Sequence, residues 1–314
     1  MLSAARRGNL YLVEGAHTRS GRLPAAPVVL VTGCASGIGL ALARRLRDWH
    51  GAHAVITARA SSLGRLRDAG FEEGERLWLR ALDVTRNSER KRIVSEIDDK
   101  LGGVDVLINN AGLTFRSVHE HLHTDEIDEQ MSINFLGPMD LARLVLPSMR
   151  RKRMGHIVNV SSVGGMMAMP TMGVYSASKF ALEGASEALW YEMRPWNVAV
   201  TLVQPGFIRS ESFRKVRLSR DAEAMRAIDG NPYGAVYESM TPFIETLMNW
   251  AIATPDTVAK RVLRTLDRPN PPLRVSATMD ARVFYMLRRL LPRRLYHAVL
   301  YRCLPNVRRW GPVD

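Results

Sequence analysis

The stretch that decides the fold is Val28-Val29-Leu30-Val31-Thr32-Gly33-Cys34-Ala35-Ser36-Gly37-Ile38-Gly39. Its first four residues are apolar and mostly β-branched, which predicts a strand buried on both faces. Its three glycines predict a sharp turn, because residues without a Cβ let the backbone bend and approach a ligand closely. A helix is expected next, with Leu40, Leu42, Ala43 and Leu46 on one side. The start of that helix would offer free N–H groups and a positive dipole end to a pyrophosphate.

The alternation of strand and helix continues along the chain. Apolar stretches predict further strands at 54–57, 77–83, 104–108, 156–160, 198–203 and 273–276. Amphipathic stretches predict helices at 86–101, about 125–150, 175–194 and 255–266. Almost wholly apolar strands that alternate with helices form a parallel sheet covered on both faces, and right-handed crossovers make it doubly wound. We therefore expect a single α/β domain of the Rossmann type, with about seven strands, over residues 27–280.

The C-terminal part differs from this core in charge. The net charge of the chain is +13, and from Arg282 onward eight arginines accompany a single acid, Asp314. Residues 281–314 predict a basic tail of two amphipathic helices broken at Pro292. Such helices can lie in a membrane interface, or can cap a cavity or a subunit interface with arginine stems covering apolar surface. We favour peripheral membrane contact.

The remaining features of the sequence indicate the cellular compartment in which the protein is expected. Residues 1–26 lack the continuous apolar core of a secretory signal, so a flexible N-terminal extension is expected, with a matrix-targeting segment as the alternative. No apolar run approaches the roughly 20 residues that span a bilayer. Cys34 and Cys303 form no disulfide or metal pattern, which favours a reducing compartment. We expect a cytoplasmic protein.

The spacing of the glycines points to a family. Gly33, Gly37 and Gly39 follow Thr32 in the order Gly-x3-Gly-x-Gly, which differs from the usual Gly-x-Gly-x-x-Gly. The sequence resembles the short-chain dehydrogenase/reductase family, and its classical group most closely, in which Thr-Gly-x3-Gly-x-Gly opens the chain. The order of motifs is similar from residue 28 to about residue 276. The resemblance implies an enzyme that moves a hydride between a nicotinamide cofactor and a carbonyl or alcohol.

The end of the second strand selects between NAD and NADP in such folds. Here the segment 55–59 ends in Arg59 and contains no acid. An acid would hold the ribose 2′-hydroxyl of NAD, whereas a planar guanidinium can clamp a 2′-phosphate. Ser36 could add a hydroxyl hydrogen bond. We therefore predict NADP(H) as the cofactor, with a solvated surface arginine as the alternative interpretation of Arg59.

Further cofactor contacts are implied by the resemblance. Asp83 with Val84 resembles the family's pair at the adenine ring, and residues 109–112 resemble its Asn-Asn-Ala-Gly motif. Residues 205–210 resemble its Pro-Gly motif, with Ser210 where many members have threonine. The residues expected to bind the cofactor are Thr32, Gly33, Ser36, Gly37, Ile38, Gly39, Arg59, Asp83, Val84, Asn110, Ala111, Gly112, Tyr175, Lys179, Pro205, Gly206, Ile208 and Ser210.

Tyr175 and Lys179 lie four residues apart, which on a helix puts both side chains on one face. An ammonium near a phenol lowers the phenol's pKa and suits it to acid and base catalysis. The resemblance adds Ser162, thirteen residues before the tyrosine, to hold the substrate oxygen, with Ser161 as the rival. It also adds Asn134, which would support a water that connects the lysine to solvent. The predicted catalytic residues are Asn134, Ser162, Tyr175 and Lys179.

The substrate is expected to be hydrophobic. The region 206–254 breaks the regular order yet holds many apolar residues, which favours a lid or a wall of a binding site. Met166, Met167 and Met169 favour an apolar pocket, since methionines adapt to irregular ligands. Within the family the chain most resembles hydroxysteroid and retinol dehydrogenases, which implies a steroid-, retinoid- or lipid-like alcohol, ketone or aldehyde. A 3-oxoacyl thioester or small polar hydroxy compound is the alternative substrate. A non-catalytic NADP(H)-binding sensor or scaffold is the alternative from another class.

Other partners are weighed in the same way. His119, His121 and His123 have no accompanying metal motif, so no metal is predicted. The basic tail lacks a nucleic-acid module, so no nucleic acid is predicted. In the family the helices at about 125–150 and 175–194 usually pair across a subunit interface, which implies a homodimer or homotetramer.

Overall fold

The computed structural model of the protein describes residues 23–210, 216–226, 228 and 230–311. Most of the expected N-terminal extension, residues 1–22, lies outside the described residues, as do the last three residues of the expected tail.

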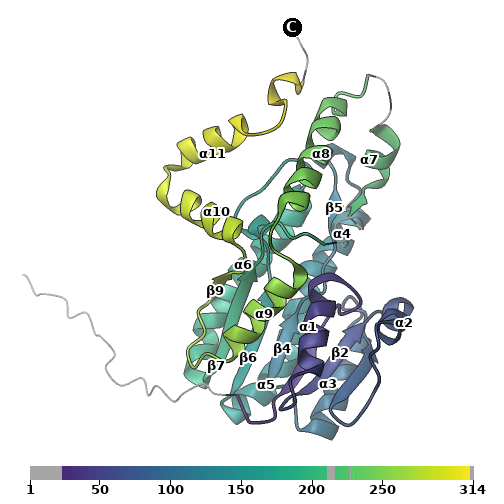
Figure 1. Cartoon of the computed structure of the whole chain (residues 1–314), viewed down its shortest axis with the longest axis vertical. Helices are drawn as coiled ribbons and strands as arrows, with labels where there is room; N and C mark the ends of the chain where they lie inside the picture. Colours follow the sequence, from purple (N-terminus) through teal and green to yellow (C-terminus); the bar gives the residue numbers. More distant parts are fainter. Residues whose placement is uncertain (1–22, 211–215, 227, 229, 312–314) are drawn as a thin grey trace, which may run out of the picture.

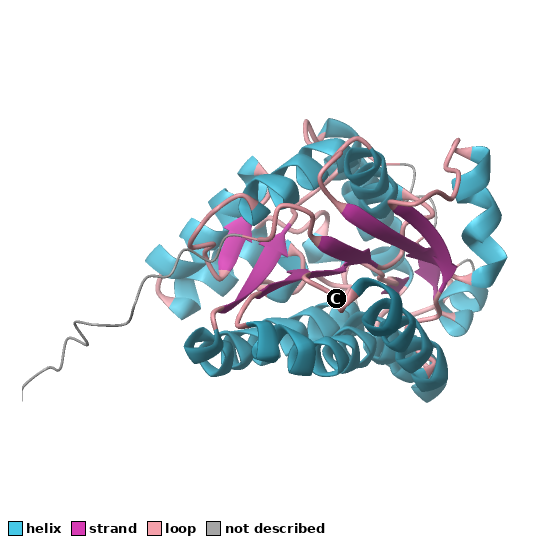
Figure 2. Ribbon diagram, turned by 90° about the horizontal axis from the view of Figure 1, so that it is seen from below, coloured by secondary structure: helices cyan, strands magenta, loops and turns pink. Residues whose placement is uncertain are grey.

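A sheet of seven parallel strands forms the centre of the molecule, in the order β3-β2-β1-β4-β6-β7-β9. Figure 2 shows this sheet between two layers of helices. The order reverses beside β1, as in a doubly wound sheet, and the predicted fold class is confirmed. The strands are β1 (Val28–Val31), β2 (His53–Ala58), β3 (Leu77–Ala81), β4 (Val106–Asn109), β6 (Gly155–Val160), β7 (Val198–Gln204) and β9 (Arg274–Ser276).

Each face of the sheet has its own apolar core, because successive side chains of a strand point to opposite faces. Val29 and Val31 join the core under α1 (Gly37–Arg47), α2 (Ala60–Asp68) and α9 (Pro255–Leu266). Val28 and Leu30 join the core under α3 (Asn87–Leu101), α5 (Gly137–Lys152) and α6 (Gly173–Met193). The near-continuous apolar strands read from the sequence are therefore explained by burial on both faces.

Two helical regions differ from the expectation. The sequence did not predict α2, where Ser61, Ser62 and Gly64 are poor helix formers. The helix expected at about 125–150 consists of α4 (Thr124–Met131), a π-helical turn at Ser132–Leu136, and α5. Such π-turns are frequent at functional sites, and this one contains Asn134.

The segment after β7 is more regular than the sequence suggested. It holds β8 (Arg217–Leu218), which pairs with β5 (Phe115–Arg116), and then α7 (Arg220–Met225) and α8 (Gly234–Trp250). Val236, Met240 and Ile244 of α8 are spaced four residues apart and form one buried stripe. Pro242 inside this helix hid the pattern, since proline normally interrupts a helix.

The last part of the chain forms α10 (Met279–Leu290) and α11 (Arg293–Arg302), separated at Pro292 as predicted. Figure 1 shows both helices extending away from the sheet, on the same end of the molecule as α8. Within the described part of the chain, no helix combines the length and apolarity needed to cross a membrane. Short 3-10 turns lie at His119–His121, Val163–Gly165, Arg194–Trp196 and Val307–Arg309.

Candidate active site

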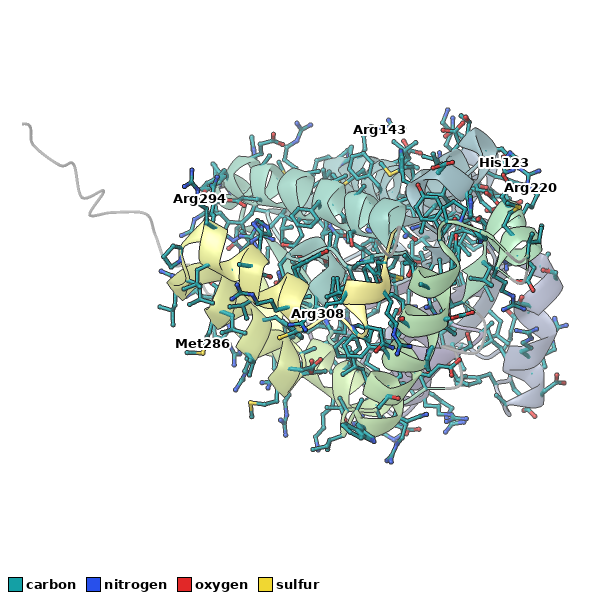
Figure 3. All side chains as sticks on the ribbon, turned by 90° about the horizontal axis from the view of Figure 1, so that it is seen from above. His123, Arg143, Arg220, Met286, Arg294 and Arg308 are labelled. Atoms are coloured by element: carbon teal, nitrogen blue, oxygen red, sulfur yellow. The ribbon has the colours of Figure 1, made fainter. Side chains whose placement is uncertain are left out.

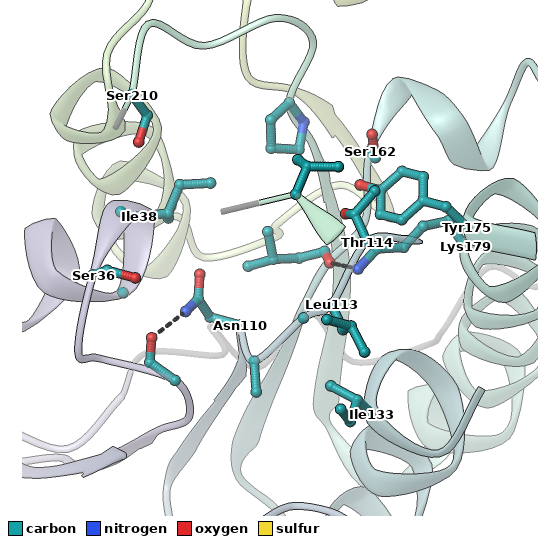
Figure 4. Close-up of a pocket in the computed structure, with 18 of the residues that line it drawn as sticks. Ser36, Ile38, Asn110, Leu113, Thr114, Ile133, Ser162, Tyr175, Lys179 and Ser210 are labelled. Carbon is teal, nitrogen blue, oxygen red and sulfur yellow. Dashed lines mark hydrogen bonds between the residues drawn. The ribbon is translucent and has the colours of Figure 1, made fainter. Parts of the chain in front are cut away.

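A cavity of about 910 Å³ lies where the carboxyl ends of β1, β4, β6 and β7 meet. Figure 4 shows Ser36 and Ile38 on one side of it and Ser162, Tyr175 and Lys179 on the other. Ligands bind at this edge of open α/β sheets. All the predicted site residues line the cavity except Thr32 and Asn134, which are buried behind its wall.

The glycine turn is held tightly against the end of β4. Gly33 has a φ of +74°, and a Cβ there would lie 2.7 Å from the Cα of Ala111. A Cβ on Gly39 would collide with the carbonyl oxygen of Gly33. The Thr32 hydroxyl oxygen accepts hydrogen bonds from the backbone N–H groups of Asn110 and Ala111, both at 3.0 Å. In return, the Asn110 side-chain amide donates to the carbonyl oxygens of Thr32 at 2.9 Å and Gly33 at 3.2 Å.

The start of α1 is open toward the cavity. Ser36 occupies the N-cap position but makes no capping hydrogen bond with its side chain, and it lines the cavity together with residues 37–39. Helix N-termini of this kind bind phosphate through backbone N–H groups and the positive dipole end. The turn therefore fits the pyrophosphate of a dinucleotide.

The end of β2 supplies positive charge. Arg59 is exposed, precedes α2 and lines the cavity, and so do Ser61, Ser62 and Arg65 of that helix. These three residues were missed because α2 was not expected, although an Arg-Ala-Ser-Ser run after a strand was visible. Two guanidinium groups and two hydroxyls, with no acid at the strand end, match the chemistry of a 2′-phosphate.

Asp83 follows β3 on the same side of the cavity. Its Oδ1 accepts hydrogen bonds from the backbone N–H of Thr85 at 2.9 Å and from the Thr85 hydroxyl at 2.7 Å. Burial alone would raise the pKa of this carboxyl, but the Thr85 hydrogen bonds and the charges of Arg86 and Arg59 lower it overall. The carboxylate is therefore a fixed acceptor at neutral pH.

Tyr175 and Ser162 meet at the other side of the cavity. The Ser162 side chain lies next to the phenol of Tyr175, and its oxygen accepts a hydrogen bond from the Gly164 N–H at 3.0 Å. Gly164 is needed as glycine, because a Cβ there would lie 2.8 Å from the Tyr175 ring. Ser161 has a buried hydroxyl without a partner in the described part of the chain.

The electrostatics of Tyr175 differ from the expectation. The four-residue spacing predicted that Lys179 would lower the pKa of the phenol. Burial instead raises the pKa of Tyr175, and the neighbouring Ser162 hydroxyl only partly offsets this rise. The Lys179 Nζ lies 6.0 Å from the centre of the tyrosine ring and donates to the Val160 carbonyl oxygen at 2.9 Å. Burial also lowers the pKa of Lys179 to about 8, against the opposing charge of Glu183.

Asn134 lies behind the cavity with its amide fully engaged. Its Oδ1 accepts from the Leu113 N–H at 2.8 Å, and its Nδ2 donates to the Leu113 carbonyl oxygen at 2.8 Å and to the Ser178 hydroxyl at 2.9 Å. The Ser178 hydroxyl donates in turn to the Tyr175 carbonyl oxygen at 2.7 Å. The asparagine thus joins the segment after β4 to the helix that carries Tyr175 and Lys179, and its role in a water relay stays a prediction.

The loop after β7 is anchored by residues that the sequence did not indicate as part of the site. The Gly206 N–H donates to the Thr278 hydroxyl at 2.9 Å, and the Phe207 N–H donates to Asp280 Oδ2 at 2.6 Å. A Cβ on Gly206 would collide with the Asp280 carboxylate. Thr278 is also the N-cap of α10, accepting from the Ala281 N–H at 3.4 Å. The first turn of α10 therefore belongs to the site, and Thr278 was recognisable only as a capping residue.

The remaining wall of the cavity is mainly apolar. It combines residues after β6 with residues from the segment 206–254: Met167, Met169, Met172, Phe207, Val216, Ile244 and Met248. Met166 is buried but faces Val163 and Ala281 instead. Thr114, Arg116 and Arg217 add polar groups to the same wall.

The three histidines lie apart from this wall. His121 shares a hydrogen bond of 2.9 Å with the Tyr237 hydroxyl, and His123 lies 3.0 Å from Asp221 Oδ1. No three His, Cys, Asp or Glu side chains gather as metal ligands among the residues described.

Comparison with known proteins identifies the family. A family model described as short chain dehydrogenase matches residues 27–221. The chain therefore belongs to the short chain dehydrogenases, oxidoreductases that bind nicotinamide cofactors, act on small substrates and are typically oligomeric. The resemblance drawn from the motifs is confirmed.

Several curated proteins are similar over most of the chain. Retinol dehydrogenase 8 of Homo sapiens is 31% identical over 291 residues, which cover 90% of this chain and 93% of that protein. The human 17-beta-hydroxysteroid dehydrogenase type 1 is 33% identical over 263 residues, covering 81% and 78%. A 3-ketodihydrosphingosine reductase of Bacteroides thetaiotaomicron is 38% identical over 180 residues, covering 57% of this chain and only 63% of that protein.

Solved structures agree with the fold. A short-chain dehydrogenase from Streptomyces avermitilis is 31% identical with a TM-score of 0.73, covering 89% of this chain and 96% of that chain. A metagenomic short-chain oxidoreductase in complex with NADP is 26% identical with a TM-score of 0.60, covering 82% and 97%.

Proposed function

We propose that the protein is an NADP(H)-dependent oxidoreductase that interconverts a hydrophobic alcohol and the corresponding ketone or aldehyde, with Tyr175 as general acid and base. The observation that carries this proposal is that Ser162 and Tyr175 lie side by side in a methionine-lined cavity that also contains the glycine turn. The relatives named as retinol and hydroxysteroid dehydrogenases support the substrate class.

The cofactor assignment rests on the residues around the two ends of the cavity. Residues 33–39 would hold the pyrophosphate, Asp83 and Val84 the adenine, and Arg59 with Ser36 the 2′-phosphate. Asn110, Ala111 and Gly112 would complete the binding site, and the Pro205–Ser210 loop with Ile208 would orient the nicotinamide. When bound, the cofactor supplies a hydride to the carbonyl carbon or accepts one from the alcohol carbon.

The chain's own residues handle the proton and the developing charge. Ser162 donates a hydrogen bond to the substrate oxygen as negative charge grows on it during reduction. Tyr175 then transfers its phenolic proton to that oxygen, and its raised pKa keeps this proton available at neutral pH. The buried ammonium of Lys179 favours the phenolate that remains, because an opposite charge nearby stabilises it. Oxidation of the alcohol runs through the same groups in reverse.

The test is reduction by NADPH across matched groups of carbonyl compounds. The panel contains steroid ketones, retinal, long-chain aldehydes, small polar hydroxy-acid precursors and 3-oxoacyl thioesters, each run with NADPH and with NADH. Turnover of the apolar compounds with NADPH is expected. Turnover of only small polar compounds or thioesters would favour the alternative substrates. Tight NADPH binding without any turnover would favour a sensor or scaffold.

We also infer that the α10–α11 surface contacts anionic membrane lipids at the periphery. Met286, Leu290, Leu295 and Tyr301 are exposed at 56%, 72%, 49% and 59% beside the arginines of the same two helices. Figure 3 shows Met286 and Arg294 on the outer side of these helices. Apolar side chains among arginines suit an anionic lipid interface.

Sedimentation with vesicles tests this contact. The protein is expected to bind vesicles that contain phosphatidylserine and to stay unbound with phosphatidylcholine alone. The double variant Met286→Ser, Leu290→Ser should bind the anionic vesicles less. Equal binding by the variant and the unchanged protein would refute the contact.

We infer a homodimer or homotetramer built through α5 and α6. Leu136, Phe180 and Tyr191 are large apolar side chains exposed on or beside these helices, and exposed apolar patches mark interaction surfaces. Light scattering coupled to size-exclusion chromatography is expected to give a mass of two or four chains. The double variant Leu136→Glu, Tyr191→Glu should shift it to one chain, and a monomer at all concentrations before mutation would refute the inference.

A further inference from the structure

Arg116 is an arginine buried in the wall of the cavity. It is the last residue of β5, pairs with Leu218 of β8, and is only 5% exposed. It lines the same cavity as Ser162 and Tyr175. Arginine is seldom buried to this degree unless a carboxylate or several hydrogen-bond acceptors surround its guanidinium.

Most side-chain N–H donors of Arg116 have no acceptor among the residues that the structure describes. Its Nη2 donates to the Thr241 hydroxyl at 3.3 Å, which is long for such a bond. Its Nε is buried and has no acceptor among the residues described. No carboxylate of the described chain lies within ion-pair distance of it, and Glu245, the acid that acts on it from α8, is itself exposed. Burial therefore outweighs that acid and lowers the pKa of the guanidinium.

A second buried arginine of this protein, Arg90, has a carboxylate partner. Arg90 is 9% exposed, and its Nε donates to Asp140 Oδ2 at 2.7 Å. Its Nη1 donates to the Val84 carbonyl oxygen at 2.6 Å. Arg90 lies in the core of the fold, where the protein must supply every acceptor, whereas Arg116 lies at a cavity that a ligand can enter. The arginine whose Nε lacks an acceptor among the described residues is therefore the one that a ligand in the cavity can reach.

The surroundings define the shape of that ligand. The cavity wall that contains Arg116 is mainly apolar, with Met169, Ile244 and Met248 from two separate parts of the chain, and its other polar groups include Thr114 and Arg217. The next cation on this wall, Arg217, already lies 3.5 Å from Glu129 Oε1. A mainly apolar wall with a guanidinium that has no acid partner among the residues described is complementary to a long apolar molecule that carries one negative charge.

We propose that Arg116 binds an anionic group of the substrate, so that the substrate is an apolar carbonyl compound or alcohol with a carboxylate or phosphate away from the reacting carbon. This inference rests on the proposed function and narrows it. It makes Arg116 a specificity-determining residue, because a neutral end leaves the guanidinium without an acceptor and an amine is repelled by it.

The test compares matched substrates that differ only in charge. Oxooctadecanoic acids with the ketone at different distances from the carboxylate are assayed with NADPH, each beside its methyl ester. Long-chain oxoalkyl phosphates of the same lengths distinguish a phosphate from a carboxylate. For the best chain position, kcat/KM for one of the anions should exceed that for the ester by about tenfold to a hundredfold, the value of a charge-assisted hydrogen bond.

Variants assign the preference to Arg116. Arg116→Gln should reduce the anion and the ester with similar kcat/KM, and Arg116→Lys should keep part of the preference, because the charge remains and the planar fork is lost. The matched control is Arg143→Gln, which removes one exposed arginine of α5 outside the cavity and should keep the full preference. A preference that survives in Arg116→Gln would overturn the inference.

Two readouts separate this inference from the proposed function. If no compound of either charge is reduced, the proposed function fails. If the esters are reduced as well as the anions, the function stands and the role of Arg116 is refuted. A readout without turnover uses octadecanoic acid, which should raise the melting temperature of the NADP-bound protein more than its methyl ester does. Equal shifts by the two compounds would count against the inference even if Arg116→Gln does not fold.

Discussion

The two halves of the cavity are built in different ways. On the dinucleotide side, Thr32, Asn110 and Ala111 exchange hydrogen bonds of 2.9 to 3.0 Å that tie the glycine turn to β4. On the proposed substrate side, the wall is made mainly of methionines and other apolar side chains, and the Nε of Arg116 has no acceptor among the residues described. A fixed polar frame suits a ligand that never changes, whereas methionines adapt to irregular molecules. The difference indicates that one side of the cavity is built to be rigid and that the other side is built to select among ligands.

The machinery between the halves shares features of both. Ser162 is held by the Gly164 N–H, as a fixed group would be. Lys179 and Tyr175, in contrast, are ionisable groups. Burial lowers the pKa of Lys179 and raises that of Tyr175, and both shifts favour the neutral form. Such perturbed groups collect at catalytic sites. The predictions below test this contrast, from the largest expected effect to the smallest.

Removal of the phenol should have the largest effect. Tyr175→Phe is expected to lower kcat for carbonyl reduction by about 10²–10⁴-fold, because general acid catalysis is lost. NADPH binding, measured by fluorescence titration, should change little. Ser162→Ala should also lower kcat strongly, whereas Ser161→Ala, the neighbouring hydroxyl, should leave it close to normal. If Ser161→Ala is the damaging change, the assignment of the serine is wrong.

Breaking the ion pair between Arg90 and Asp140 should lower the stability of the fold. Asp140→Asn removes the carboxylate from the half-buried pair with Arg90 and should lower the free energy of unfolding by about 2 kcal/mol in denaturant titration. Glu223→Gln breaks an exposed pair with Arg226 and should cost less than about 0.5 kcal/mol. Arg116→Gln breaks no ion pair of the described residues and should resemble the second variant. A loss for Arg116→Gln as large as for Asp140→Asn would erase the contrast between the two arginines.

Reversing the charge at the end of β2 should change the cofactor. Arg59→Asp is expected to lower kcat/KM for NADPH by about tenfold to a hundredfold, because a carboxylate repels the 2′-phosphate. Activity with NADH should persist or rise. The control is Arg67→Asp, an exposed α2 arginine that does not line the cavity. If the ratio of kcat/KM with NADPH to kcat/KM with NADH does not change in Arg59→Asp, the choice of cofactor would have to be assigned to Arg65 and the serines of α2.

The pH dependence of stability should reveal the buried ammonium. The folded pKa of Lys179 is lowered from 10.5 to about 8, so between these values the unfolded chain binds more protons than the folded one. Stability should therefore rise with pH in this window, by up to about 1.4 kcal/mol per unit. The raised pKa of Tyr175 acts in the opposite sense above pH 10, since the folded state then keeps a proton that the unfolded state releases.

Comparison with the Lys179→Met variant isolates the contribution of Lys179 to the pH dependence of stability. The melting temperature of the unchanged protein should gain on that of the variant between pH 8 and pH 10. Parallel curves over this range would mean that the lysine is not desolvated as its position in the structure implies.

Part of the site could be read from the chain because it depends on short spacings. The glycine turn, the Tyr175–Lys179 pair and the interval to Ser162 place their groups through the geometry of one strand, one turn and one helix. The parallel sheet also followed, since strands buried on both faces are apolar throughout. The domain limits at residues 27 and 280, and the lid role of residues 206–254, stay predictions.

Other parts could not be read in this way, because local pattern and tertiary context disagreed there. The sequence of α8 contains Pro242, yet its buried stripe against Met169 and Val118 makes it a helix. The pKa of Tyr175 was predicted to fall from its spacing to Lys179, but burial of the ring dominates and raises it. Local propensity and spacing are weak guides wherever burial supplies the larger free energy.

By itself, the sequence determined the alternation of the main strands and helices and the glycine turn after the first strand, and it predicted the catalytic groups, because these patterns lie within a few neighbouring residues. Only the tertiary structure decided that Thr278 and Asp280 anchor the Gly206 loop and that α2 brings Arg65 to the cavity. It also decided that Arg116 is buried with no acid partner within the described part of the chain. These features join residues far apart in the chain. The free energy of burying a charge depends on which distant groups surround it, and no spacing along the sequence records that.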